Sequence, residues 1–345
     1  MRCEWKKVKI SDVCKICYGK DHKQLLDGNV PAYGSGGIIR RVNKSIHEKK
    51  SVLIPRKGSL DNLFFVDPPF WTVDTLFWTD IDETKINPAF FFYQLKTLDL
   101  ASKNVGTAVP SLTTSVLNDI EINLPSMDIQ KQIAAILSAL DEKIAINRAI
   151  NENLEQQARA IYSSMFIDNP DPAWSHGHLS DLITVKYGKD HKKLADGIYP
   201  VYGSGGIMRY VERPLYNKES VLIPRKGTLN NVMYVNQPFW SVDTMFYTEM
   251  KLPNVAKFVY HFVKAKDLAS MNAGSAVPSM TTDILNAMEV VIPSASALEE
   301  FESLVAPMYE AMEANDVQSK ALSQMRDTLL PKLMSGEIDV SAIQL

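Results

Sequence analysis

The feature that most constrains the fold of this chain is an internal repeat at an offset of 169 residues. Tyr18–Lys23 returns as Tyr187–Lys192, and Ser51–Gly58 returns as Ser220–Gly227. Between residues 18 and 79, roughly 38 of 62 positions are identical in the second copy. Because chance does not produce a match of this length, the chain holds two copies of one domain of roughly 120 residues.

A long amphipathic segment follows each copy. After the first copy, apolar residues recur at alternating spacings of four and three from Ile133 to Ile161, which predicts a helix of about 35 residues. After the second copy, the same spacing runs from Phe301 to Leu333. Pro307 is expected to kink this second helix near its start, and Gly336 is expected to end it.

Both apolar seams carry asparagine near the middle, at Asn147 and Asn151 in the first and at Asn315 in the second. A buried asparagine pair can fix the register of two helices at some cost in stability. Matching length, period and central asparagine predict that the two helices pair antiparallel. The alternative is two separate amphipathic helices, each lying on its own globular core. The predicted subunit-interface residues are the apolar seam positions Ile133, Leu137, Leu140, Ile144, Leu154, Leu322, Leu329 and Leu333.

Charge divides the chain in the same places as the repeat. Residues 1–125 hold 17 Lys and Arg against 14 Asp and Glu, and residues 176–293 hold 13 against 10, so each copy has a net charge of +3. Residues 126–175 carry −3 and residues 294–345 carry −6, which gives the total of −3. The repeats are therefore basic and the helical segments acidic, and a repeated basic excess favours nucleic acid as the partner of the repeats.

Several classes of protein are excluded by simple patterns. No run of about 18 apolar residues exists, so we expect no membrane span. Residues 1–7 lack the apolar core of a signal peptide. The three cysteines all lie in the first 17 residues, and an odd, clustered count fits a reducing cytoplasm without a disulfide framework.

Within the repeat, short β-branched and aromatic runs alternate with loops and one helix. Strands are predicted at 51–54, 63–66 and 75–78, and helices at 86–98 and 255–265. Loops that glycine permits, Gly34–Gly37 and Arg56–Gly58, follow the predicted strands, while Trp71 and Trp240 are expected in the core. The fold class is therefore α+β, with two similar mixed α/β domains separated by two long antiparallel coiled-coil helices.

Three motifs resemble catalytic, metal-binding or phosphate-binding motifs, but each is incomplete or is absent from the other copy. Cys14 and Cys17 have zinc spacing, but a tetrahedral site needs four ligands and the chain has no second cysteine pair. Asp67–Phe70 matches the Asp-Pro-Pro-aromatic motif of DNA amino-methyltransferases, yet Asn236–Phe239 in the other copy lacks the first proline. The cluster Gly34–Gly37 is not followed by the Gly-Lys-Ser/Thr of a phosphate-binding loop. We expect no catalytic residue and no metal site.

The residues that both copies place in loops match the chemistry of DNA contact. Arginine fits a guanine edge with two hydrogen bonds, whereas lysine and serine fit phosphates. The predicted DNA-binding residues are Lys20, His22, Lys23, Tyr33, Ser35, Arg40, Arg56, Lys57, Lys189, His191, Lys192, Tyr202, Ser204, Arg209, Arg225 and Lys226.

Two helical stretches carry a resemblance to a known family. Pro125–Ala134, Ile136–Ile144 and Asn151–Glu155 are similar to the central conserved region of the specificity subunits of type I restriction–modification systems, and Leu329–Ile338 is similar to their C-terminal conserved end. The resemblance covers nearly the whole chain. It implies target-recognition domain 1 at 1–125, the central conserved long helix at 126–167, target-recognition domain 2 at 170–293 and the C-terminal conserved long helix at 294–345.

The resemblance also implies partners and a pseudo-twofold arrangement. Such a chain binds double-stranded DNA and two modification subunits, which bind S-adenosylmethionine and methylate adenine N6. Restriction subunits add ATP- and Mg-dependent translocation and cleavage. The chain itself would bind no cofactor and would work in a bacterial or archaeal cytoplasm.

Because the predicted contact loops of the two copies nearly coincide, the bipartite target is expected to be near-palindromic. Two other readings stay open, a stand-alone DNA amino-methyltransferase and a coiled-coil adaptor that does not read DNA.

Overall fold

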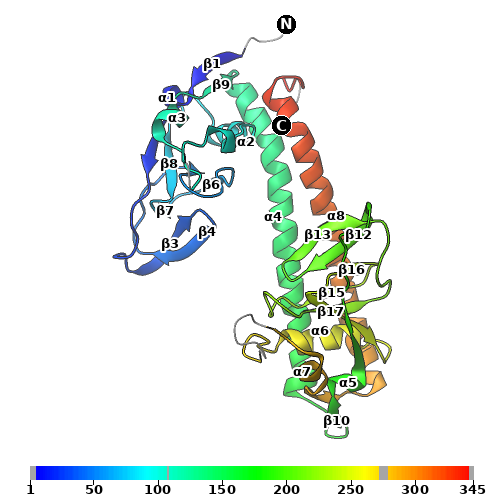
Figure 1. The fold of residues 1–345 in the computed structure, drawn as a ribbon. Helices are drawn as coiled ribbons and strands as arrows, with labels where there is room; N and C mark the ends of the chain where they lie inside the picture. The colour runs from blue at the N-terminus through cyan, green and yellow to red at the C-terminus, as the bar shows by residue number, and fades with distance from the viewer. Residues whose placement is uncertain (1–4, 107–108, 272–278, 342–345) are drawn as a thin grey trace. The chain divides into compact units, whose positions relative to one another are not determined.

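The structure is a computed structural model that describes residues 5–106, 109–271 and 279–341. It divides into two compact units (Figure 1). Unit 1 comprises Met1–Arg148 and Asp316–Leu345, and unit 2 comprises Ala149–Asn315. Each unit therefore contains one copy of the repeat together with part of each long helix, so the helices are not separate domains.

Unit 1 is built on an antiparallel four-stranded sheet with the order β2-β8-β5-β6. A three-stranded sheet, β4-β3-β7, and a two-stranded sheet, β1-β9, complete its β structure. The strands are β1 (Lys6–Lys9), β2 (Cys14–Tyr18), β3 (Asp27–Gly34), β4 (Gly37–Val42), β5 (Ser51–Pro55), β6 (Phe64–Val66), β7 (Trp71–Thr72), β8 (Leu76–Ile81) and β9 (Glu121–Leu124). The helices are α1 (Ile10–Val13), α2 (Pro88–Lys96), the 3-10 turn η1 (Ala101–Lys103), α3 (Thr114–Asn118) and the start of α4 (Met127–Ser163).

Unit 2 repeats this plan, with sheets β11-β17-β14-β15, β13-β12-β16 and β10-β18. Its strands are β10 (Ser175–His178), β11 (Ile183–Tyr187), β12 (Asp196–Gly203), β13 (Gly206–Val211), β14 (Ser220–Pro224), β15 (Met233–Val235), β16 (Trp240–Ser241), β17 (Met245–Met250) and β18 (Glu289–Ile292). Its helices are the π-helical end of α4, η2 (Ser164–Asp168), then α5 (Leu179–Leu182), α6 (Ala256–Lys264), α7 (Thr282–Asn286) and the start of α8 (Ala295–Met334). Two similar mixed domains and two long helices confirm the predicted fold class.

In each main sheet, one of the two inner strands, β5 or β14, is buried on both faces. All five residues of β5 are buried, including the polar Ser51. Ser51 Oγ donates to the carbonyl oxygen of Thr79 at 2.8 Å and accepts from the Thr79 amide at 2.9 Å, so its burial leaves no polar group unpaired. Ser220 and Thr248 repeat the pair in unit 2 at 2.8 and 2.9 Å.

The long helices run antiparallel within each unit. In unit 1, Arg326 of α8 donates to Asp141 of α4 at 2.5 Å. In unit 2, Asn315 Nδ2 donates to Asn151 Oδ1 at 2.8 Å, and the rings of Tyr162 and Phe301 meet edge to face. The predicted antiparallel pairing and the central asparagine contact are thus confirmed. α8 runs as one continuous helix through Pro307 and stops before Gly336, whose φ of +70° suits glycine.

The seam residues pack inward, which corrects their prediction as a subunit interface. Ile133, Leu137 and Leu333 are at most 1 % exposed and belong to the core of unit 1. Ile144 is 6 % exposed, while Leu140, Leu154, Leu322 and Leu329 are partly buried. The heptad period therefore describes burial of the helices within this chain.

Within the described ranges, no helix combines the length and the apolar composition that crossing a membrane requires.

Candidate DNA interface

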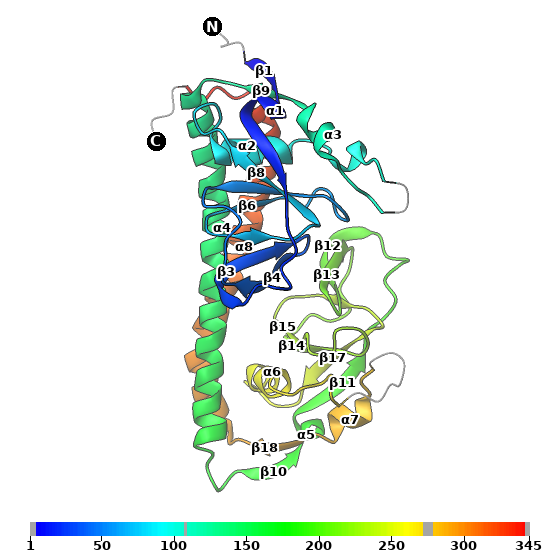
Figure 2. The ribbon, with the colours of Figure 1, turned by 90° about the vertical axis from the view of Figure 1, so that its left-hand side faces the viewer.

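Four loops meet at one end of each unit because of the sheet register. In unit 1, β2 ends at Tyr18 and β5 ends at Pro55, and both ends lie beside the start of β8. β3 runs parallel to β7, so the turn after Gly34 lies next to the turn that joins β7 to β8. This loop end lies away from the β1-β9 sheet in unit 1 and away from the β10-β18 sheet in unit 2 (Figure 2).

An exposed tyrosine and an arginine form a pair at the centre of these loops. The guanidinium of Arg56 lies 5.3 Å from the ring centre of Tyr18, and its Nη1 donates to the carbonyl oxygen of Asp74 at 3.2 Å. Tyr18 is 52 % exposed. Arg225 and Tyr187 repeat the pair at 5.4 Å. Two contacts hold each guanidinium at a fixed place while part of its donor edge stays accessible, which suits recognition of a base edge.

Tyr18 and Tyr187 are not among the residues predicted to bind DNA. The available signal was an aromatic residue directly before the repeated Gly-Lys-Asp-His-Lys loop in both copies. Their role as partners of arginine depends on the β2-β8-β5 register, which brings together loops that are far apart in the chain.

The lysine-bearing loop 19–23 is fixed through its main chain. The amide of Lys20 donates to the carbonyl oxygen of Thr72 at 2.9 Å, and Trp71 Nε1 donates to the carbonyl oxygen of Lys20 at 3.0 Å. A side chain on Gly19 would lie 2.0 Å from the carbonyl oxygen of Val73, so only glycine allows this approach. The side chains of Lys20 and Lys23 remain exposed, as do those of their counterparts in unit 2.

The two tryptophans predicted in the core each donate a hydrogen bond to this loop. Trp240 is 7 % exposed, as predicted, and donates to the carbonyl oxygen of Lys189 at 2.8 Å. Trp71 is only partly buried. In both units, therefore, the indole N–H holds the lysine loop.

The remaining predicted loop residues are placed as follows. Lys57 and Lys226 are exposed, and their backbones bridge to Ser111 and Ser279. His22 and His191 are partly buried, and their Nδ1 atoms make no hydrogen bond within the described chain.

The glycine-rich hairpin tip is tethered to the Arg56–Gly58 side of the unit. Asn62 Nδ2 donates to the carbonyl oxygen of Ser35 at 2.7 Å, and Asn231 repeats this contact with Ser204 at 2.8 Å. Both serine side chains are partly exposed.

Arg40 and Arg209 are tied into their own units. Arg40 Nη2 donates to the carbonyl oxygen of Leu25 at 3.0 Å and to Asp27 Oδ1 at 2.7 Å. Arg209 repeats both contacts at 2.8 and 3.0 Å. These two arginines stabilise the β3-β4 and β12-β13 hairpins, and they lie in strands β4 and β13 rather than in the loops where they were expected.

Tyr33 and Tyr202 also contribute to packing. The Tyr33 ring lies 6.0 Å from the ring of Phe64, and burial raises the pKa of its hydroxyl. Tyr202 is 9 % exposed and packs against Phe239. The exposed polar groups at the loop end are therefore mainly Tyr18, Lys20, Lys23 and Lys57 with their counterparts, and Arg56 and Arg225 are partly exposed beside them.

The residues of the methyltransferase-like motif and of the cysteine pair lie on the surface or in the core of unit 1. Asp67 is on the surface, 3.5 Å from Lys50, while Phe70 is fully buried. Cys14 is buried, and burial raises the pKa of its thiol to about 12. No cluster of three metal-ligating side chains occurs among the residues that the structure describes.

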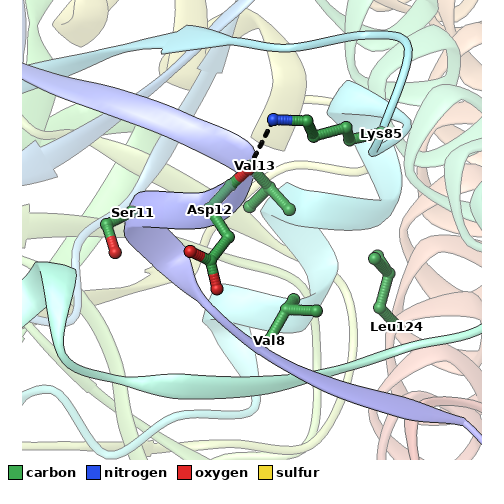
Figure 3. Close-up of a pocket in the computed structure, with 6 residues that line it drawn as sticks. All are labelled: Val8, Ser11, Asp12, Val13, Lys85 and Leu124. Atoms are coloured by element: carbon green, nitrogen blue, oxygen red, sulfur yellow. Dashed lines mark hydrogen bonds between the residues drawn. The ribbon is translucent and has the colours of Figure 1, made fainter.

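A shallow pocket beside α1 is lined by Val8, Ser11, Asp12, Val13, Lys85 and Leu124 (Figure 3). Lys85 Nζ donates to the carbonyl oxygen of Asp12 at 3.0 Å. This lysine therefore anchors α1 rather than reaching toward the loop end.

Comparison with known proteins agrees with this arrangement. Residues 3–156 and 173–301 match the model of the type I restriction modification DNA specificity domain. The specificity subunit of the type I restriction enzyme MjaIX from Methanocaldococcus jannaschii is 23 % identical, over 99 % of this chain and 95 % of that protein. The HindI specificity subunit from Haemophilus influenzae is 21 % identical, over 69 % of this chain and 73 % of its own length.

A solved structure shares the fold. The crystal structure of a type I restriction–modification system S subunit from M. genitalium has a TM-score of 0.68 and 20 % identity, covering 96 % of each chain. The matched family model spans both repeats and much of the first long helix. The chain therefore belongs to the family of type I restriction–modification DNA specificity subunits, which recognise DNA and are not themselves catalytic.

Proposed function

We propose that this chain reads a bipartite DNA target, with one half recognised by the loop end of unit 1 and the other by that of unit 2. The observation that carries the proposal is the recurrence of the same pair in both units, an exposed tyrosine with a partly exposed arginine, beside exposed lysines. The pairs are Tyr18 with Arg56 and Tyr187 with Arg225. An arginine held on an aromatic ring is suited to a guanine edge, and the lysines are suited to phosphates.

The partners follow from the family. We propose that two modification subunits bind the chain and methylate adenine N6 in each half of the target, using S-adenosylmethionine bound on those subunits. Restriction subunits that use ATP and Mg join the same complex, in a bacterial or archaeal cytoplasm. The acidic helical segments, with net charges of −3 and −6, favour protein partners over DNA on the helices.

The test is sequencing of methylated DNA from the host with and without this gene. We expect one bipartite adenine-methylated motif to disappear when the gene is deleted and to return with the wild-type gene. If no motif depends on the gene, the chain is an adaptor that does not direct methylation.

A stand-alone methyltransferase is distinguished by a second measurement. Calorimetry of the purified chain with S-adenosylmethionine is expected to show no binding, whereas binding to the chain alone would support the methyltransferase reading.

A further inference from the structure

Exposed aliphatic side chains follow the tip of the same hairpin in both units. Ile38 and Ile39 at the start of β4 are 54 % and 50 % exposed, and Ile207 and Met208 at the start of β13 are 49 % and 60 % exposed. A single exposed apolar residue is ordinary on a protein surface. Two neighbouring ones at the same place in both units, at the end that carries the exposed cations, need an explanation.

A β-bulge in the hairpin sets the direction of one of these side chains in unit 1. Tyr33 pairs with Ile38 and Ala32 with Arg40, so Ile39 is the extra residue of a β-bulge. Bulges change the direction in which a side chain points. A side chain on Gly34 would lie 3.1 Å from Ile39 Cγ2, so this glycine gives the isoleucine its place.

Unit 2 repeats the bulge with a different aliphatic residue. Val201 pairs with Arg209 and Tyr202 with Ile207, which leaves Met208 as the extra residue. A side chain on Gly203 would lie 2.6 Å from Met208 Sδ, so here too glycine makes room for the aliphatic group.

The tip ahead of the aliphatic residues is narrow. Side chains added at Gly36 and Gly37 would meet nothing within 4 Å, and the φ of +114° at Gly37 requires glycine. Ser35 therefore carries the only side chain beyond Cα in the Gly34–Gly37 tip. Two strands about 5 Å apart with so slim a tip fit the major groove of B-DNA, which is about 12 Å wide and admits a β-ribbon.

The chemistry of the groove identifies the contact. The apolar group that the major groove displays is the C5 methyl of thymine, and aliphatic side chains recognise it. We infer that Ile38 and Ile39 in unit 1, and Ile207 and Met208 in unit 2, contact thymine methyl groups in their half-sites. The inference rests on the proposed function, because it places the hairpin in DNA that the flanking cations attract.

The first experiment replaces thymine by deoxyuridine, which removes only the methyl group. The complex of this chain with its modification subunits is titrated with a duplex that carries the motif identified by sequencing of methylated DNA. The titration is then repeated with duplexes in which one half-site thymine at a time is replaced by deoxyuridine. We expect about fourfold weaker binding at each contacted position, because burial of one methyl-sized group is worth about 0.8 kcal/mol.

The second experiment assigns the contact to the hairpin. The double variant Ile38→Ser with Ile39→Ser is expected to lose the thymine preference in one half-site only, with an unchanged salt dependence of binding, since no phosphate contact is lost. Leu26→Ser is the matched control, because Leu26 is 70 % exposed and lies at the other end of the same hairpin. Ile207→Ser with Met208→Ser is expected to affect the other half-site, with Ile198→Ser as control.

The outcomes separate the two ideas. Failure of the wild-type complex to prefer its target over unrelated DNA would overturn the proposed function. Specific binding with no effect of deoxyuridine at any half-site thymine, or without thymine in the half-sites, would overturn the hairpin contact alone. Retained thymine preference in the double variant would also overturn it, and would assign the methyl contact to another loop.

Discussion

At the scale of single residues, the loop end separates two kinds of cation. Arg56 is held by the Tyr18 ring and the Asp74 carbonyl, whereas the Lys57 side chain is exposed beside it. A fixed guanidinium suits a directional contact with a base, and a free ammonium suits a phosphate.

This difference gives a prediction for paired variants. Arg56→Ala is expected to relax recognition of one half-site at a cost of about 1–3 kcal/mol, and Arg225→Ala the other. Lys57→Ala is expected to weaken binding to all sequences. It is also expected to reduce the slope of log affinity against log salt concentration by about one, because one phosphate contact is lost. Binding titrations at several salt concentrations, with specific and unrelated duplexes, measure both. If the Arg and Lys variants give the same pattern, the division into base and phosphate contacts is wrong.

A buried histidine makes unit 2 sensitive to acid. His261 is 4 % exposed, its Nε2 lies 3.0 Å from the Tyr309 hydroxyl, and burial lowers its pKa to about 4. Between pH 6.5 and 4 the unfolded chain binds a proton that the folded chain does not, so the free energy of unfolding falls as pH falls through this window.

We therefore expect His261 to cost about 2 kcal/mol of stability by pH 5 relative to pH 7. Chemical unfolding of the wild type and of His261→Gln at both pH values checks this, because Gln can still bond the Tyr309 hydroxyl. The variant is expected to lose less stability on acidification. An equal loss in both proteins would assign the acid sensitivity to other groups.

Residue-scale prediction from the sequence had a clear limit. The repeat identified Arg56, Lys57 and the Lys20 loop as shared features, and the structure leaves their side chains at the loop end. The repeat could not reveal that Arg40 is bound to Asp27, because that ion pair depends on the pairing of β3 with β4. Exposure and partnership of a side chain are properties of the folded hairpin.

At the scale of elements, an ionic contact joins α2, α4 and α8 within unit 1. Asp141 accepts from the Tyr93 hydroxyl at 2.7 Å and from Arg326 Nη1 at 2.5 Å. The side chains of Arg326 and Asp141 are 20 % and 30 % exposed. Loss of the shared acceptor leaves a buried donor, Tyr93, and a partly buried one, Arg326, without it, which costs more than loss of a surface pair.

Asp141→Ala is therefore expected to destabilise unit 1 by about 2 kcal/mol. Asp327→Ala is the control, because Asp327 pairs with the same arginine but is 63 % exposed, and its loss is expected to stay within about 0.5 kcal/mol. Thermal and urea unfolding measure both variants. Equal losses would show that the contact between the helices and α2 adds nothing.

The elements themselves were well anticipated where a period or an identical repeat defined them. The helix expected after Pro125 is α4, and the strand expected at 51–54 is β5. The seam positions were predicted both to pair the two helices and to form a subunit interface, because a heptad pattern reports burial but not what buries it. Phe90 belongs to the core of unit 1 and Phe246 to the core of unit 2, and both cores include residues of these helices. The heptad pattern does not show that the domains cover the helices in this way.

At the scale of the whole molecule, the two units present nearly the same loops. The lysine loop, the glycine tip and the Pro-Arg-Lys-Gly turn agree between copies, and they make the same internal contacts. Two domains with the same contact groups should read the same few bases.

The target is therefore expected to be an interrupted palindrome or close to one, with one adenine methylated in each half. Differences such as Arg41 against Tyr210 can change one base. Single-molecule sequencing of methylated DNA decides the matter. Half-sites that share no more than one base would show that the matching loops are scaffold and that the differing residues carry specificity.

Several anchors of the loops bind main-chain carbonyls of the loop residues, and this has a consequence for how specificity can change. Trp71 bonds the carbonyl of Lys20, Asn62 bonds the carbonyl of Ser35, and the Leu112 amide bonds the carbonyl of Arg56. A carbonyl is the same in every amino acid, so exchanging the side chains at these positions leaves the anchors in place. These anchors therefore place no requirement on the side chains of Lys20, Ser35 and Arg56, so recognition can change at these three positions while the anchors remain.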